Sequence, residues 1–143
     1  MYVFSLLGCN GNDDAKKEIH AQLLRNRNLS LAYIDSGMMG EASDKLAELE
    51  RLLPSEAFVY ANQGLVALRQ NNLEKASSLL KKAVSLKPRN PEIALLRAEV
   101  AMLTGNFDEA KKIVNSAIAA NPGNMRLRWE LSDKVEHLQV IVD

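Results

Sequence analysis

Apolar and small residues recur along this chain at helical spacing, and the whole pattern then repeats. Residues 71–88 and residues 105–122 carry apolar, small, charged and proline positions in nearly the same order, 34 residues apart. A third, looser copy occupies residues 37–54. A period of this length over three copies is typical of repeat architectures, in which each unit buries its apolar face against its neighbour.

Each copy predicts an antiparallel helical hairpin. In the middle copy, apolar positions fall at three- and four-residue spacing within residues 58–68 and again within residues 73–86. Residues 70–72 (QNN) separate the two helices, because Asn tolerates left-handed backbone conformations. Pro88 ends the second helix, because the proline ring disfavours helical geometry at the preceding residue.

Small residues are predicted where helices cross. Gly64 lies inside a predicted helix, where glycine costs ~1 kcal/mol relative to Ala, and the residues one period before and after it are also small. We therefore expect a second helix to approach closely at this position, and we expect Ala76 and Ala110 to lie at helix crossings. Lys82 is expected on the outer face, where it contributes little to stability.

This order of small residues, alanines and prolines resembles the tetratricopeptide repeat, with copies starting at residues 23, 57 and 91. The matching residues are Leu29, Ser30, Tyr33, Ala42 and Pro54 in the first copy, Tyr60, Gly64, Ala67, Ala76, Ala83 and Pro88 in the second, and Ala98, Ala101, Ala110, Ala117 and Pro122 in the third. Departures from the family pattern are Asn26, Gln63, Ala94 and Arg97.

The resemblance covers residues 23–122 and implies an all-α fold. It implies a right-handed superhelix of three antiparallel helix-turn-helix repeats, at about 23–56, 57–90 and 91–124, within a domain of residues 13–143. A C-terminal capping helix is expected at about 125–142. One long opening helix is expected over residues 13–36, capped by Asn12 or Asp13.

The amino-terminal tail, residues 1–12, supports two interpretations. Leu6-Leu7-Gly8-Cys9 resembles the lipobox of bacterial lipoproteins, which implies lipidation of Cys9 and a lipid anchor on the periplasmic side of the cell envelope. However, only eight residues precede Cys9 and none is Lys or Arg, whereas a signal peptide starts with a charged segment. A short apolar terminus with an incidental thiol, in a cytoplasmic protein, is the alternative.

Composition argues against several classes of partner. The chain has 143 residues, and Lys plus Arg equals Asp plus Glu at 18 each, so no strong basic field favours nucleic acid. The sequence contains no stretch of eighteen apolar residues, which a membrane-spanning helix would need. A membrane is therefore expected as a partner only through an anchor at Cys9.

Chemical motifs are not evident in the sequence. His20, His137 and Cys9 are too widely separated for a Cys/His metal spacing, and no glycine-rich phosphate loop occurs. Glu130, Asp133 and His137 share a predicted helix face, where such trios are usually solvated side-chain pairs. We therefore expect no enzyme activity, no metal and no cofactor.

The resemblance implies that the first helix of each repeat lines a concave groove that binds proteins or peptides. Carried over by repeat position, the groove residues are Leu24, Arg27, Asn28, Leu31, Phe58, Asn62, Leu65, Arg69, Glu92, Leu96 and Glu99. A family subtype clamps the acidic carboxyl terminus of chaperones. Arg27 and Asn62 match that clamp, but Leu31, Glu92 and Leu96 do not, so docking of chaperone tails is disfavoured.

The leading functional interpretation is a non-catalytic interaction module that binds a partner protein or peptide in its groove, as a lipid-anchored adaptor in bacterial envelope assembly if the lipobox is real. The chain ends in three consecutive β-branched residues, VIV, before Asp143. This ending favours an alternative, namely a structural spacer or oligomerisation domain from a longer repeat protein. The same ending suggests a further hypothesis, self-association through the C-terminal helix.

Overall fold

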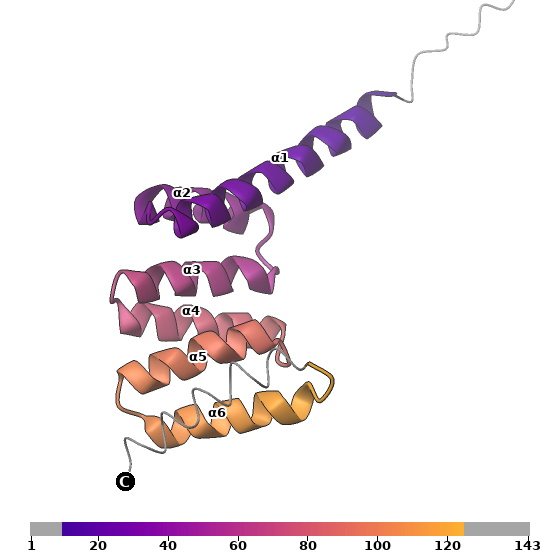
Figure 1. Ribbon diagram of the computed structural model, residues 1–143. Helices are drawn as coiled ribbons and strands as arrows, with labels where there is room; N and C mark the ends of the chain where they lie inside the picture. The colour runs from indigo at the N-terminus through magenta and orange to yellow at the C-terminus, as the bar shows by residue number, and fades with distance from the viewer. Residues whose placement is uncertain (1–9, 125–143) are drawn as a thin grey trace, which may run out of the picture.

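The computed structural model describes residues 10–124, which form six α-helices and no strand. The helices are α1 (Asn10–Asp35), α2 (Met39–Leu52), α3 (Ala57–Arg69), α4 (Leu73–Leu86), α5 (Pro91–Leu103) and α6 (Phe107–Ala120) (Figure 1). The prediction of an all-α fold is confirmed. Cys9 and the capping helix expected at about 125–142 lie outside the described residues.

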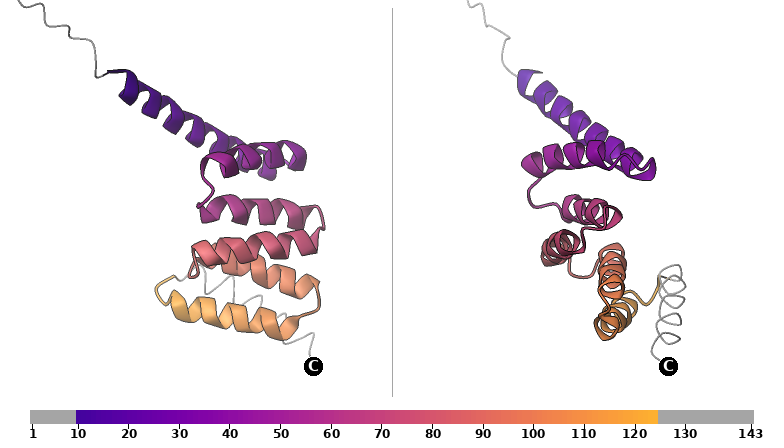
Figure 2. Two further views of the ribbon diagram at one scale, coloured as in Figure 1. Left: turned by 180° about the vertical axis from the view of Figure 1, so that it is seen from behind. Right: turned by 90° about the vertical axis from the view of Figure 1, so that its left-hand side faces the viewer.

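Consecutive helices pair as antiparallel hairpins, α1 with α2, α3 with α4 and α5 with α6, and the hairpins stack one on the next (Figures 1 and 2). Between hairpins, α3 contacts both α2 and α5, and α4 contacts α5. The middle hairpin is therefore covered on two sides. This position explains why eight residues of α3 are buried, more than in any other described helix.

The turn inside each hairpin has the same backbone geometry. Gly37, Asn71 and Gly105, spaced by 34 residues, all have positive φ, between 58° and 76°. In each turn the amide of the following residue donates to a carbonyl five residues back at 2.8 Å, as Asn72 does to Ala67. This pattern is the Schellman motif, in which a left-handed residue ends a helix and satisfies its last carbonyl groups.

Asparagine side chains begin two of the helices. The Asn72 side chain accepts a hydrogen bond from the Lys75 amide at the start of α4, and Asn90 accepts one from Ile93 at the start of α5, both at 3.1 Å. The cap expected at Asn12 or Asp13 was wrong, because α1 begins at Asn10 and includes both residues. An acidic residue in the first turn still favours the helix through its dipole.

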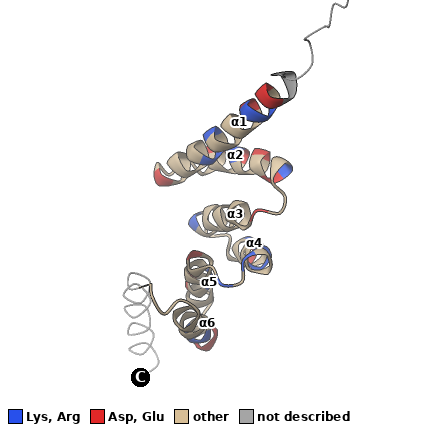
Figure 3. Ribbon diagram, turned by 90° about the vertical axis from the view of Figure 1, so that its right-hand side faces the viewer, with Lys and Arg blue, Asp and Glu red and all other residues tan. Residues whose placement is uncertain are grey.

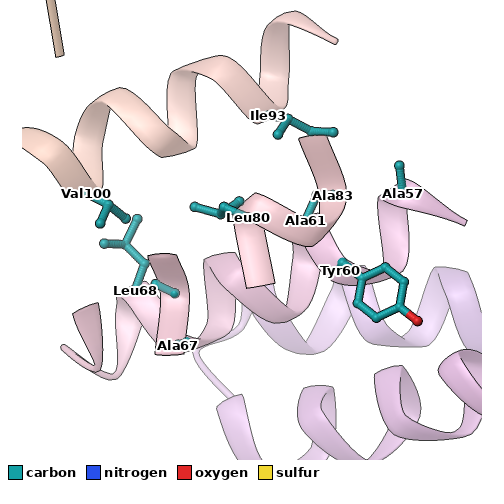
Figure 4. Packing of buried hydrophobic residues seen from close by; sticks show 10 residues of the cluster. Ala57, Tyr60, Ala61, Ala67, Leu68, Leu80, Ala83, Ile93 and Val100 are labelled. Carbon is teal, nitrogen blue, oxygen red and sulfur yellow. The ribbon is translucent and has the colours of Figure 1, made fainter. Parts of the chain in front are cut away.

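Close approach of α3 and α4 confirms the prediction made for Gly64. A Cβ atom at Gly64 would lie 2.8 Å from Cγ of Leu80. Ala76 and Ala110 are fully buried, as are Ser30 and Ala98 at the positions equivalent to Gly64. Figure 4 shows Leu80 beside Leu68, Ile93 and Val100, so that α4 fills the space between α3 and α5 with one apolar cluster.

Helix α1 extends well beyond the hairpin that it forms with α2 (Figures 1 and 2). Every residue from 13 to 22 is exposed, whereas Asn26, Ser30 and Ile34 are buried. The projecting part carries ion pairs with the neighbouring turns, Lys17 with Asp14 and Arg25 with Glu18. Local helix propensity and such pairs, rather than packing, therefore stabilise it.

Candidate functional site

All eleven residues predicted to line the groove lie on α1, α3 or α5, and none of them is buried. Leu24 and Leu31 are 46% and 38% exposed. Phe58, Leu65 and Leu96 are partly exposed. We call these eleven residues the first-helix strip: Leu24, Arg27, Asn28, Leu31, Phe58, Asn62, Leu65, Arg69, Glu92, Leu96 and Glu99.

A side-chain contact joins α1 to α3 within the strip. The Arg27 guanidinium lies over the Phe58 ring, 5.0 Å from its centroid, in a cation–π arrangement. Phe58 and Leu65 also pack against the buried cluster that includes Ile34 and Val66. Phe58 therefore has both a buried edge, which supports the fold, and an accessible surface.

Charge divides the strip along its length. Helix α3 carries a single charged residue, Arg69, and Arg27 lies on α1, whereas α5 contributes Glu92 and Glu99 (Figure 3). The other residues of the strip, including Asn62 and the leucines, are uncharged. The strip thus presents cations toward α1 and α3, and carboxylates on α5.

The polar departures from the family pattern have carboxylate partners that the sequence did not reveal. The buried Asn26 side chain donates to Glu48 at 3.0 Å, and Gln63 donates to Glu50 at 2.8 Å. Arg97 lies 3.7 Å from Glu109. Each pair links a first helix to a second helix, so the polar side chains still connect elements that apolar contacts would otherwise join. Ala94, the fourth departure, has no such partner side chain.

Lys82 is exposed, as predicted, but it is not isolated. Its ammonium lies 4.1 Å from the centroid of the Tyr60 ring, whose hydroxyl donates to the Pro54 carbonyl at 2.8 Å. Hydrogen bonding to Tyr60 raises the pKa of Lys82 above its ordinary value of 10.5, and the charge of Glu50 adds to the rise. The expectation that Lys82 contributes little overlooked this contact.

The part of the chain that the structure describes contains no group of three or more His, Cys, Asp or Glu side chains placed to hold a metal. The trio Glu130, Asp133 and His137 lies outside that part. Within residues 10–124, none of the helices has the length and apolar character needed to cross a membrane.

Comparison with known proteins gives a family match over part of the chain, and a fold. Residues 67–132 match the family model of the tetratricopeptide repeat, and no curated protein sequence matches the chain. The type III secretion translocator chaperone SycD of Yersinia enterocolitica has a similar structure, with a TM-score of 0.81 at 16% identity over 95% of this chain and 97% of that one. A type III secretion complex from Aeromonas hydrophila has a TM-score of 0.74 at 17% identity, over 85% of this chain and 81% of that one.

A third similar structure is the second repeat domain of human RPAP3 in complex with an HSP70 peptide. Its TM-score is 0.67 at 20% identity, over 80% of this chain and 95% of that one. Together with the family match, these structures confirm the resemblance. The chain has a tetratricopeptide repeat fold, and residues 67–132 match that family. At these identities the structural likeness shows the fold alone.

Proposed function

We propose that this protein is a non-catalytic interaction module that binds a partner protein or peptide along the first-helix strip. One observation supports the proposal: the first helices of three stacked hairpins carry accessible leucines and Phe58, with charged residues among them. Exposed apolar patches with polar rims tend to mark interaction sites. Tetratricopeptide repeats are generally interaction modules, and the similar RPAP3 domain is in complex with a peptide.

Chemistry of the strip indicates what the partner presents. Leu24 and Leu31 on α1, with Phe58 and Leu65 on α3, suit apolar side chains at the cationic end. Arg69 and Asn62 suit a carboxylate or a peptide carbonyl, because both donate hydrogen bonds. The carboxylates of Glu92 and Glu99 suit a basic residue near α5. This chemistry differs from a chaperone tail, whose acidic end Glu92 would repel.

Pairs of leucines matched in exposure allow a sharp test. Leu24 in the strip is 46% exposed and Leu52 on α2 is 44% exposed, whereas Leu31 and Leu86 are 38% and 37% exposed. Peptides are selected from a random display library on the wild-type chain. We expect Leu24→Ser and Leu31→Ser to lower the affinity for the selected peptides at least tenfold. Leu52→Ser and Leu86→Ser should leave this affinity unchanged.

The opposite pattern, or peptides that bind all four variants equally, would place the binding surface elsewhere. Circular dichroism of each variant separates loss of binding from loss of fold. Since each leucine pair has the same residue type and a similar exposure, a difference in affinity reports the location of the residue.

We further propose that the module is a lipid-anchored adaptor in the bacterial envelope. The support is the Leu6-Leu7-Gly8-Cys9 sequence alone. When the protein is produced in a bacterium from its gene with the natural upstream region, an alkyne-labelled fatty acid should mark the wild type and not a Cys9→Ser variant. Absence of label from the wild type would refute the anchor without affecting the proposal for the strip.

A further inference from the structure

A cavity of about 280 Å³ lies between α5 and α6, beside the turn that enters α5. Its walls include Pro88, Ala94, Arg97, Ser116, Ala117 and Ala120, and none of its lining residues belongs to the first-helix strip. Cavities that hold small ligands measure roughly 300–1,000 Å³. This cavity is at the small end, which suits one side chain rather than a larger molecule.

The internal repeat shows what fills the same place one hairpin earlier. The residues 34 positions before Ala94, Pro88 and Ser116 are Tyr60, Pro54 and Lys82. In the second hairpin the Tyr60 ring is 1% exposed, its hydroxyl donates to the Pro54 carbonyl, and Lys82 lies over its face. The third hairpin retains the proline and the surrounding helices but has only a methyl group where the ring would be. The cavity therefore occupies the place that the Tyr60 side chain fills in the second hairpin.

Charge around the cavity indicates the neighbours of an incoming side chain. Arg89 and Lys112 line it together with Arg97 and Glu109, and the last two lie 3.7 Å apart. Three cations against one carboxylate give the lining an excess of positive charge. Acidic residues next to the inserted side chain are therefore favoured and basic ones disfavoured.

We propose that this cavity binds the tyrosine side chain of a partner peptide that carries acidic residues beside that tyrosine. The ring occupies the space beside Ala94, Ala117 and Ala120, and its hydroxyl is directed to Pro88, as that of Tyr60 is to Pro54. Flanking carboxylates contact Arg89 and Lys112. This second site is independent of the first-helix strip.

The test uses blocked tripeptides, Glu-Tyr-Glu, Glu-Phe-Glu and Lys-Tyr-Lys, titrated into the full chain labelled with ¹³C in its alanine methyl groups. We expect Glu-Tyr-Glu to shift the methyl signals of Ala94, Ala117 and Ala120. Glu-Phe-Glu should bind several-fold more weakly because it lacks the hydroxyl, and Lys-Tyr-Lys should not bind measurably.

Two variants make the outcome decisive. Ala94→Tyr fills the cavity from within and should abolish binding, whereas Ala119→Tyr, at an exposed position on α6 that does not line the cavity, should leave binding intact. Ser116→Lys, also at an exposed position, restores the counterpart of Lys82 and should tighten binding about two- to fivefold through a cation–π contact.

Unchanged affinity in Ala94→Tyr, or shifts that avoid the three alanines, would overturn the proposal. Because Ser116→Lys alters only an exposed residue, it keeps the test valid if Ala94→Tyr does not fold. Equal binding of Glu-Tyr-Glu and Lys-Tyr-Lys would contradict the assigned charge preference. Loss of strip binding in Leu24→Ser leaves this experiment unaffected, so the two proposals fail separately.

Discussion

Single residues with left-handed backbone set where each hairpin turns. Gly37 and Gly105 have φ of 75° and 76°, and no atom lies within 4 Å of a Cβ added at either position. The cost of a side chain there is therefore conformational and not steric. Asn71 adopts the same region at 58°, which Asn tolerates better than most residues with a side chain.

We expect Gly105→Ala to lower the free energy of unfolding by about 1–2 kcal/mol, the cost of left-handed backbone for a residue with a Cβ. Asn71→Gly should be neutral or stabilising by up to about 1 kcal/mol, because glycine adopts left-handed backbone without strain. Gly40→Ala, inside α2 with open space around it, is the control and should not destabilise. Urea denaturation measures all three, and equal losses in Gly105→Ala and Gly40→Ala would contradict the turn argument.

Lys82 should make stability depend on pH in the alkaline range. Because its pKa is raised in the folded protein, its stabilising contribution is fully present below 10.5, the ordinary value, and is lost as the pH rises through the higher folded value. The difference in melting temperature between wild type and Lys82→Met should therefore be constant from pH 7 to about 10 and then shrink. Lys75→Met, exposed on the same helix, should show no comparable change.

At the scale of helices, the close packing of α3 and α4 should decide whether Gly64→Ala stabilises or destabilises the protein. Gly64→Ala gains about 1 kcal/mol of helix propensity, but its Cβ would meet Leu80 at 2.8 Å, and overpacking costs about 1–3 kcal/mol. We expect a net loss of about 1 kcal/mol in the wild-type background.

In a Leu80→Ala background, the same Gly64→Ala change should stabilise by up to about 1 kcal/mol, because the obstructing side chain is gone. Leu80→Ala alone should cost about 2–5 kcal/mol. Thermal or urea unfolding of the four proteins forms a double-mutant cycle. Additive effects would show that α3 and α4 do not touch at this point.

The arrangement of helices could be predicted because the signals that define it are local or periodic. Asn71 and Pro88 mark helix ends by their own backbone preferences, and Ala76 and Ala110 mark crossings by their spacing. The polar pairs could not be predicted, because the contact of Asn26 with Glu48 depends on how two helices cross.

The position of the strip was expected from the family resemblance, and all eleven of its residues are at least partly exposed. The contact of Arg27 with Phe58 could not be predicted, because it depends on the rotamer of a long side chain between two hairpins. The cavity beside Ala94 had a signal in the sequence: Ala94 departs from the family pattern, and Tyr60 stands one period earlier.

For the whole molecule, stability should vary along the stack. Amide hydrogen exchange should be slowest in α3 and α4, which neighbouring hairpins cover on both sides, and fastest over residues 13–22, which are exposed throughout. Exchange followed by mass spectrometry measures this gradient. Protection of residues 13–22 equal to that of α3 would indicate that something packs on the projecting part of α1.

The first-helix strip crosses all three hairpins, and the two outer hairpins pack mainly on the middle one, through α2 with α3 and through α3 and α4 with α5. A partner that lies along the strip would therefore contact all three hairpins and hold both outer ones against the middle one. Since a ligand that binds only the closed stack stabilises it by mass action, opening of the outer hairpins should become rarer as partner concentration rises. Occupancy of the strip would then set how stiff the molecule is.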